Sequence, residues 1–430
     1  NYMLGGYDGY NFQDHKFIGG GCLNRVGTSL YGCGGRFSSI VGGNNNIVDQ
    51  ASAFIGGGNN NRISSYNNSG GTIGGGTFND IGAYASSGFV GGGFNNYVEG
   101  SAASIVGGSN NSVSGLYAFI GGGKCNFNIG QLSFIGAGYK NRICGYEAAN
   151  GIVSGKCNNI TYGNNTQGFI GGGFGNCING YSNRTSIVGG CSNSASLSSC
   201  SFIGGGCCNI LKCSIGSSIV GGGNNIISGS TLLVKGVATN VGNFNVLGGS
   251  LNKISGSYSA VFGLSNTSSK HCAQFIAGEG NSIYSSNNYY GNSNPKHSTI
   301  AGGCNNKINE GCSFIGGGAL NTIGGYFGGV GNVIESAHSA ILGGMNNTAS
   351  GNRTIIGGGC KNYIHQFDNH AGILGGRHNC IDLSAIPGGI SNDIFLIGSY
   401  LTASDSGAVC QLITYMNNTV VTGSLTVGSQ

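Results

Sequence analysis

The chain has 430 residues, of which 90 are glycine and only 2 are proline; 39% are hydrophobic and 7% are charged. Without a Gly-X-Y period this glycine content excludes collagen, and the ordinary hydrophobicity with a net charge of +5 excludes a disordered polyelectrolyte. The weak charge and the lack of an apolar run of roughly 18 residues lead us to expect neither nucleic-acid binding nor membrane insertion.

The main feature, followed in chain order, is a short repeat. Residues 102–123, AASIVGGSNNSVSGLYAFIGGG, contain its parts: an apolar pair, two or three glycines, an Asn two positions before another apolar residue, and a Ser/Gly turn. Apolar pairs recur from Met3-Leu4 to Ile373-Leu374, mostly 14 to 18 residues apart, with an irregular stretch at 232–245. This period suits one two-strand coil of a parallel β-solenoid per repeat.

The predicted fold is therefore all-β, a parallel β-solenoid or β-roll of about 24 short coils. We assign residues 1–398 to this repeat shaft, which begins in mid-repeat, so that we expect an upstream part to be missing. Residues 399–430 form a C-terminal closing β segment without the repeat. At about 4.8 Å per coil, a shaft of this kind would be about 110–120 Å long.

The first strand of each coil is predicted to be apolar on both faces, because adjacent residues of a strand point to opposite sides. We interpret Ile105-Val106 and Phe119-Ile120 as equivalent pairs that place one apolar column inside and one outside. An outer apolar ladder is too large for a monomer, so we expect a homotrimer, intertwined or side by side, with the ladder facing its axis. The predicted interface residues are Phe54, Phe89, Phe119, Phe134, Phe169, Phe202 and Phe314.

The second strand is predicted to be buried on one face only. In Asn111-Ser112-Val113 and Asn61-Arg62-Ile63 the Asn and the aliphatic residue share a face, and the residue between them is polar. We expect the Asn column to form hydrogen-bonded ladders between coils, as stacked identical amides do.

These units resemble the Gly/Asn-rich repeat fibre proteins of tailed bacteriophages, whose coils read much like SFIGGGxxNxIxG. They are also similar to the head of the YadA-type trimeric adhesins, a parallel β-roll built as a trimer. The resemblance covers residues 3–398, and the end of the chain is similar to the β segments that close such fibres. It implies a structural protein of the virion surface, with an upstream virion or appendage component and a host-cell glycan or protein as partners.

Catalytic chemistry is not expected. The thirteen carboxylates form no recurrent close pair of the kind that a glycan-cleaving tailspike needs, and Glu279 and Glu310 occupy different places in the repeat. The IGGGxxN motif recurs too often, and without a following helix, to be a phosphate-binding loop. We predict no enzyme activity and no cofactor.

Metal binding is weighed at two clusters and is not favoured at either. One is Cys207-Cys208 with Cys213. The other is the set of polar residues His365, Asp368, His370 and His378, interpreted as solvated turn residues. The seventeen cysteines lack paired spacing, so most are expected to be free thiols, which suits assembly in a reducing cytoplasm.

Two insertions interrupt the spacing, Cys22–Ser39 and Ile283–Thr299. Insertions in solenoids form loops on one face, often the binding face, so the second is a candidate receptor-binding loop, with simple loop tolerance as the alternative. The candidate receptor-binding residues are Tyr284, Tyr289, Tyr290, Asn292, Lys296 and His297.

The predicted function is the shaft of a virion tail fibre or similar surface appendage that presents or forms a host-receptor-binding adhesin. Two alternatives remain. An ice- or surface-binding solenoid would need a flat, regular outward array, whereas the outward column of the second strand mixes Arg, Ser, Tyr, Cys and Lys. A glycan-degrading tailspike would need the paired carboxylates that the repeat lacks.

Overall fold

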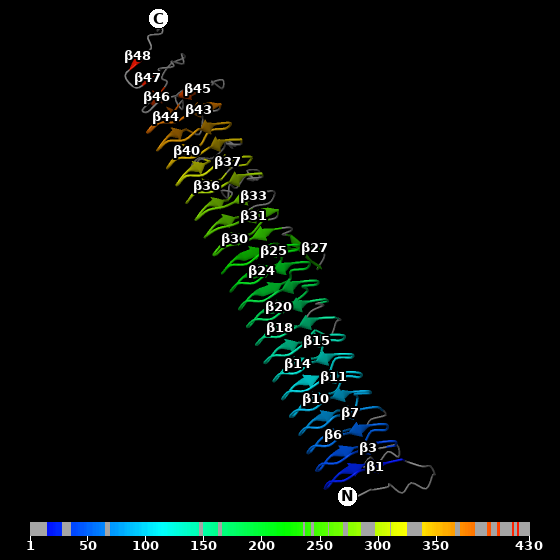
Figure 1. Cartoon of the computed structure of the whole chain (residues 1–430). Coiled ribbons are helices and arrows are strands. Elements are labelled where there is room, and N and C mark those ends of the chain that lie inside the picture. Colours follow the sequence, from blue (N-terminus) through cyan, green and yellow to red (C-terminus); the bar gives the residue numbers. More distant parts are fainter. Residues whose placement is uncertain are drawn as a thin grey trace. The chain divides into compact units, whose positions relative to one another are not determined.

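The computed structural model describes residues 15–27, 36–64, 69–145, 149–161, 166–234, 237–241, 245–256, 258–269, 274–284, 297–309, 311–324, 338–365, 370–382, 394–396, 402–404, 415–416 and 419–420. Over these residues the chain consists of short strands and turns, with no helix. It divides into two compact units, unit 1 (residues 1–216) and unit 2 (residues 217–430), and each is a parallel β-solenoid (Figure 1).

Unit 1 alternates two series of strands. The first strands of its coils are β1 (Phe17–Ile18), β3 (Ser39–Ile40), β5 (Phe54–Ile55), β7 (Thr72–Ile73), β9 (Phe89–Val90), β11 (Ser104–Ile105), β13 (Phe119–Ile120), β15 (Phe134–Ile135), β17 (Gly151–Ile152), β19 (Phe169–Ile170), β21 (Ser186–Ile187) and β23 (Phe202–Ile203). The second strands are β2 (Arg25–Val26), β4 (Ile47–Val48), β6 (Arg62–Ile63), β8 (Asp80–Ile81), β10 (Tyr97–Val98), β12 (Ser112–Val113), β14 (Phe127–Asn128), β16 (Arg142–Ile143), β18 (Asn159–Ile160), β20 (Cys177–Asn179), β22 (Ser194–Ser196) and β24 (Ile210–Lys212).

Unit 2 repeats this arrangement. Its first strands are β25 (Ser218–Ile219), β29 (Val246–Leu247), β31 (Ser259–Val261), β33 (Gln274–Ile276), β35 (Thr299–Ile300), β37 (Phe314–Ile315), β39 (Ala340–Ile341), β41 (Ile355–Ile356), β43 (Ala371–Ile373) and β45 (Ile394–Leu396). Its second strands are β26 (Ile226–Ser228), β30 (Lys253–Ile254), β32 (Thr267–Ser268), β34 (Ser282–Ile283), β36 (Lys307–Ile308), β38 (Thr322–Ile323), β40 (Thr348–Ala349), β42 (Tyr363–Ile364), β44 (Cys380–Asp382) and β46 (Thr402–Ser404).

Two antiparallel hairpins depart from the coils of unit 2. The irregular stretch noted in the sequence contains β27 (Ser230–Val234) and β28 (Val237–Val241), and the C-terminal segment contains β47 (Tyr415–Met416) and β48 (Thr419–Val420). The all-β parallel solenoid predicted from the repeat is confirmed. The predicted number of about 24 coils is too high: within the described ranges each of the two strand series has 22 members.

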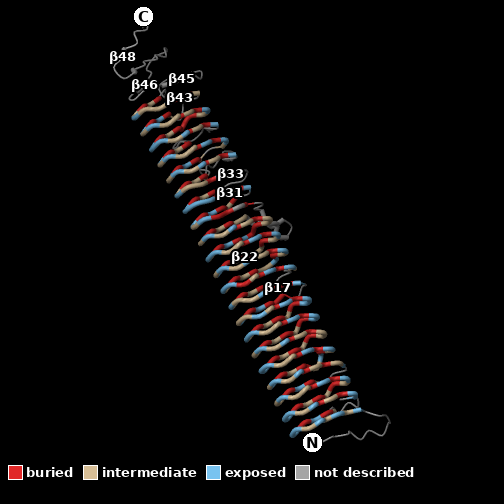
Figure 2. Tube along the Cα trace, in the orientation of Figure 1, coloured by how far each residue is buried: buried red, intermediate tan, exposed pale blue. Residues whose placement is uncertain are grey.

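Consecutive coils pair in register. Phe119 of β13 lies beside Phe134 of β15, and Ile120 lies beside Ile135, in parallel pairing. The aliphatic residue of each first strand points inward and is fully buried, as Ile105 and Ile120 are, and it meets the inward residue of the second strand, such as Val113. The core is thus two stacked columns of mostly Ile and Val enclosed by the coil, and buried positions recur at the same place in coil after coil (Figure 2).

The predicted asparagine ladder is confirmed, and it runs beside this core. The Asn111 side-chain nitrogen Nδ2 donates to the Gly107 and Gly123 carbonyl oxygens at 3.1 and 3.0 Å, and to Asn96 Oδ1 at 3.1 Å. Asn111 Oδ1 accepts in turn from the backbone N–H of Asn126 at 3.0 Å. Each such asparagine is almost completely buried, so the ladder satisfies the backbone of the turn that joins the two strands.

A glycine column lies next to this ladder, at the third position after the inward aliphatic residue in unit 1, as Gly123 is after Ile120. Gly123 has φ +87°, and a Cβ there would overlap the carbonyl oxygen of Gly138 in the next coil. Both the left-handed backbone and the close stacking therefore require glycine.

One expectation about the strands is wrong. Ile105-Val106 and Phe119-Ile120 are not equivalent pairs, because Ser104 is in register with Phe119 and Ile105 with Ile120. No single outer position of the first strand is therefore apolar in nearly every coil. The reason is that the core demands an aliphatic residue at the inward position, whereas the outer apolar group stands before it in some coils and after it in others.

Candidate functional site: an exposed apolar face

The outer side of the first strands carries exposed apolar side chains in both units. We call this surface the apolar face. It consists of the phenylalanines before the buried aliphatic residue and of the large residues after it. In unit 1 these are Phe17, Phe54, Phe89, Phe119, Phe134, Phe169, Phe202, Val41, Val106, Val153 and Val188, and in unit 2 they are Val220, Phe262, Phe275, Phe314, Leu342 and Leu374.

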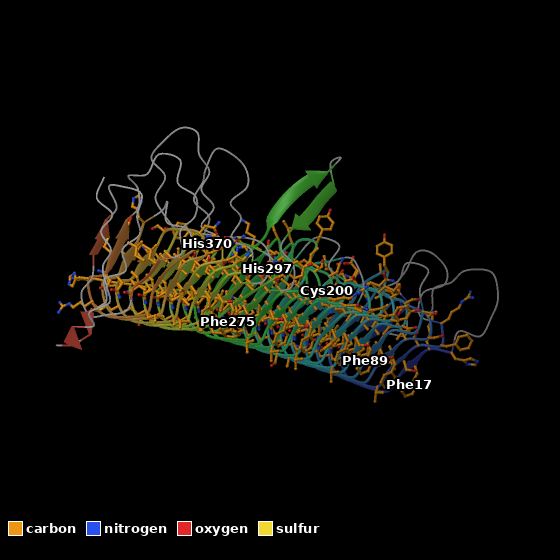
Figure 3. All side chains as sticks on the ribbon, turned by 90° about the horizontal axis from the view of Figure 1, so that it is seen from above. Phe17, Phe89, Cys200, Phe275, His297 and His370 are labelled. Atoms are coloured by element: carbon orange, nitrogen blue, oxygen red, sulfur yellow. The ribbon has the colours of Figure 1, made fainter. Side chains whose placement is uncertain are left out.

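All seven predicted interface phenylalanines belong to the apolar face, and all are exposed in the single chain. Phe119 keeps 39% of its surface exposed while the adjacent Ile120 keeps none. Figure 3 shows Phe17 and Phe89 along one side of unit 1, away from Cys200, which lies at the turn that leads into the next coil. The predicted orientation of these phenylalanines is therefore confirmed. The second copy that was predicted to cover them remains a prediction.

Phenylalanine and valine occupy two different columns of the face. In β13 the order is Phe119, buried Ile120, Gly121, whereas in β11 and the residue after it the order is Ser104, buried Ile105, Val106. Each of these coils thus presents one large apolar group, on one or the other of two neighbouring columns. No ionisable residue stands in either column among the described coils.

Steric fit explains why a phenylalanine before the buried residue goes with a glycine after it. An added Cβ at Gly121 would lie 3.4 Å from the Phe119 ring and would overlap the carbonyl oxygen of Gly136. The ring therefore lies across the glycine of its own coil. The Phe134 ring, one coil further along, extends over the coil that follows its own. An added Cβ at Gly151 in that following coil would come 2.9 Å from the Phe134 ring atom Cζ. The phenylalanines lie flat against a backbone that glycine leaves open.

The size of the face distinguishes it from ordinary surface. A phenylalanine side chain presents roughly 200 Å², so an exposed fraction near 40% leaves roughly 80 Å² for each ring and roughly 560 Å² for the seven rings of unit 1. The valines, about half exposed, add to this total. A monomeric soluble protein rarely exposes a larger contiguous patch, and larger ones mark interaction surfaces.

The outer side of the second strands is different. Its residues in consecutive coils of unit 1 are Arg62, Asp80, Tyr97, Ser112, Phe127 and Arg142, in parallel register. Burial raises the pKa of Asp80, and the nearby Arg62 guanidinium opposes that rise. This face is mixed and partly charged, as predicted, and it offers no regular array.

The predicted receptor-binding residues lie mostly outside the described residues. Tyr284 follows β34 and His297 precedes β35, so the two are described, while Tyr289, Tyr290, Asn292 and Lys296 are not. Figure 3 shows His297 and His370 along one side of unit 2 and Phe275 along another.

The candidate metal residues are dispersed. Cys207 and Cys208 have their sulfur atoms 3.4 Å apart, but Cys213 belongs to the turn at the other end of β24. His370 contacts the Arg353 guanidinium at 3.1 Å, Asp368 lies outside the described residues, and the described part of the chain holds no group of three or more metal-binding side chains. Fourteen cysteines are described, and all are free thiols. Of the two carboxylates considered for catalysis, Glu279 lies in a turn and Glu310 is outside the described residues.

No protein-family model matches the chain, and no curated protein matches it either. Over the described ranges, the structure contains no helix long and apolar enough to cross a membrane.

Proposed function

We propose that the chain is the structural shaft of a virion tail fibre or similar surface appendage, assembled as a homotrimer through the apolar face. The supporting observation is the exposed apolar face itself, which recurs along the first strands of both units and carries no charge. A surface of this kind needs a cover, and the cover must repeat with the same period as the coils.

A second copy of the chain meets that requirement most simply. Around a threefold axis parallel to the stack, the same coil of each copy would stand at the same height. Some layers would then hold three phenylalanines, as at Phe119, and others three smaller residues, as at Ser104, flanked by Val106. Burying the exposed part of each ring is worth about 2 kcal/mol, so the many coils together favour assembly strongly.

The role in a virion rests on the repeat. Its coils resemble those of Gly/Asn-rich phage fibre proteins, and a solenoid of stacked coils suits a shaft that holds a receptor-binding part away from a particle. The proposed partners are two further copies, an upstream virion or appendage component, and a glycan or protein of the host-cell surface. Fourteen free thiols suit folding in a reducing cytoplasm before release to the virion or cell surface.

Electron microscopy with mass measurement of the purified protein tests this function. We expect elongated, unbranched particles whose mass is that of three 43.2 kDa chains. Compact particles containing a single chain would contradict the proposal.

The candidate receptor-binding loop has its own test. Replacing residues 285–296 by a short Ser-Gly turn should abolish binding to host cells while the trimer still assembles. The matched control replaces residues 28–35, inside the other insertion, and should leave binding unchanged. Unchanged binding after the first replacement would show that the loop is merely tolerated.

A further inference from the structure

A second surface of unit 1, distinct from the apolar face, collects positive charge. It lies at the turn after the glycine column, and we call it the basic corner, defined by Lys124, Tyr139, Lys140, Lys156 and Phe174. Lys124, Tyr139, Lys156 and Phe174 are direct parallel neighbours in four consecutive coils. At about 4.8 Å per coil these four residues span roughly 15 Å.

The three lysines are exposed, and the ammonium groups of Lys140 and Lys156 lie against aromatic rings. Lys140 Nζ lies 5.1 Å from the centre of the Tyr139 ring, and Lys156 Nζ lies 5.8 Å from the same ring and 5.6 Å from that of Phe174. Cation–π contacts of this length orient a lysine without burying its charge. A hydrogen bond with Tyr139 also raises the pKa of Lys140, so this lysine stays charged.

No described carboxylate offsets this charge. The described carboxylates of unit 1 are Asp49, Asp80 and Glu99, all on second strands or directly after them and in earlier coils than Lys124. Arg142, on the second strand of the coil that holds Tyr139, adds a fourth exposed cation. Glu147, in the sequence between these cations, lies outside the described residues. Four of the eighteen basic residues of the chain are thus concentrated in three consecutive coils.

Polar groups continue the corner into the preceding coils. Lys124 is the parallel neighbour of Ser109, and the adjacent Asn110 accepts a hydrogen bond from Asn95 Nδ2 at 2.8 Å. Hydroxyl and amide groups therefore lie in the coils before the lysines, in two neighbouring columns, and Phe94 precedes Ser109 in the first of them. Such an arrangement matches a partner that is linear, anionic and rich in hydrogen-bonding groups.

We propose that the basic corner binds a linear anionic polysaccharide that runs along the stacked coils. One coil step is comparable to the length of one sugar ring, so successive sugars meet successive coils. Carboxylate or sulfate groups pair with the lysines, hydroxyl groups bond to the Ser and Asn side chains, and the rings contact apolar sugar faces. The site belongs to unit 1 alone and requires neither the receptor loop nor the role of a fibre shaft.

A nucleic acid fits the corner less well. Nucleic-acid binding proteins neutralise on the order of 6–10 phosphates to bind tightly at physiological salt. The basic corner with Arg142 offers four cations, fewer than this.

Titration calorimetry of the assembled full-length protein tests the proposal, with polygalacturonate as the anionic probe, neutral dextran as the uncharged probe and single-stranded DNA as the competing class. The test variant carries Lys124→Gln, Lys140→Gln and Lys156→Gln. The matched control carries Lys212→Gln, Lys253→Gln and Lys307→Gln, which remove the same charge from exposed positions on second strands. Circular dichroism checks that both variants keep the fold.

We expect polygalacturonate to bind the wild type, and dextran not to bind it. The test variant should bind about tenfold more weakly, which corresponds to about 1.4 kcal/mol, and the control should stay within about twofold. A wild type that binds no polygalacturonate, or equal losses in the two variants, would overturn the site. Tighter binding of DNA than of polygalacturonate would overturn the class of partner.

Discussion

At the scale of single residues, one glycine and one asparagine in each coil determine how closely the coils stack. The glycine of the column at Gly123 lets the backbone turn where a side chain would collide with the next coil, and Asn111 ties three neighbouring turns together through buried hydrogen bonds. Neither residue touches the apolar face. Both act on the fold of the single chain.

The role of the glycine column can be tested by comparing a substitution in it with one at the glycine directly before it. Gly123→Ala should lower the free energy of unfolding by about 2 kcal/mol or more, because the left-handed backbone and the overlap with Gly138 both penalise a Cβ. In Gly122→Ala the nearest atom to the new Cβ is 4.0 Å away, so this control should change stability little. Guanidinium unfolding measures both. Equal tolerance of the two substitutions would show that the stacking is looser than described.

The asparagine ladder predicts a larger effect than its single side chain suggests. Asn111→Leu keeps the volume but leaves the carbonyl groups of Gly107 and Gly123 and the N–H of Asn126 without this partner. With about 1 kcal/mol for each buried hydrogen bond lost, we expect a loss of about 3 kcal/mol in unfolding free energy. Ser112→Ala, the adjacent outward position, is the control. A loss below about 1 kcal/mol for Asn111→Leu would contradict the structural role of the ladder.

At the scale of the strand, much could be predicted from the sequence and one step could not. The repeat period predicted the solenoid, and the Asn-x-aliphatic segment predicted which residues of the second strand point inward. The register of the first strand was mispredicted because apolar pairs were aligned as units. A better signal was present: Asn111 follows Ile105, and Asn126 follows Ile120, by the same six residues. Aligning coils on the asparagine identifies the inward residue in each described coil of unit 1, whereas in unit 2 Leu247, Val261 and Ile276 precede their asparagines by five residues.

The corrected register has a direct consequence for stability. Ile105→Ala should cost about 3 kcal/mol of unfolding free energy, because Ile105 is completely buried in the core. Val106→Ala should cost at most about 1 kcal/mol, because half of Val106 is exposed in the chain. Thermal unfolding of the two variants distinguishes them. A larger loss for Val106→Ala than for Ile105→Ala would contradict the register in which Ile105 is the inward residue.

The basic corner was not predicted either. Its lysines are 16 residues apart in the sequence, and they become neighbours only because each coil returns to the same edge. The net charge of +5 for the whole chain does not reveal this local concentration of lysines. Counting charge column by column, once the period is known, would have found it.

At the scale of the whole molecule, the central claim is that the apolar face joins copies of the chain. Phe119 lies on that face, whereas Arg62 is exposed on the second-strand side. Phe119→Asp would bring three carboxylates together at the proposed axis without partners, which is costly unless they are neutralised or hydrated. Arg62→Asp changes the charge of each chain twice as much, but on a surface that stays in water.

Sedimentation of the wild type and these two variants tests the claim most directly. We expect the wild type and Arg62→Asp to sediment as trimers, and Phe119→Asp to dissociate or to assemble only partially. A soluble, folded wild-type monomer, or equal effects of the two substitutions, would contradict the assignment of the apolar face as the surface of assembly.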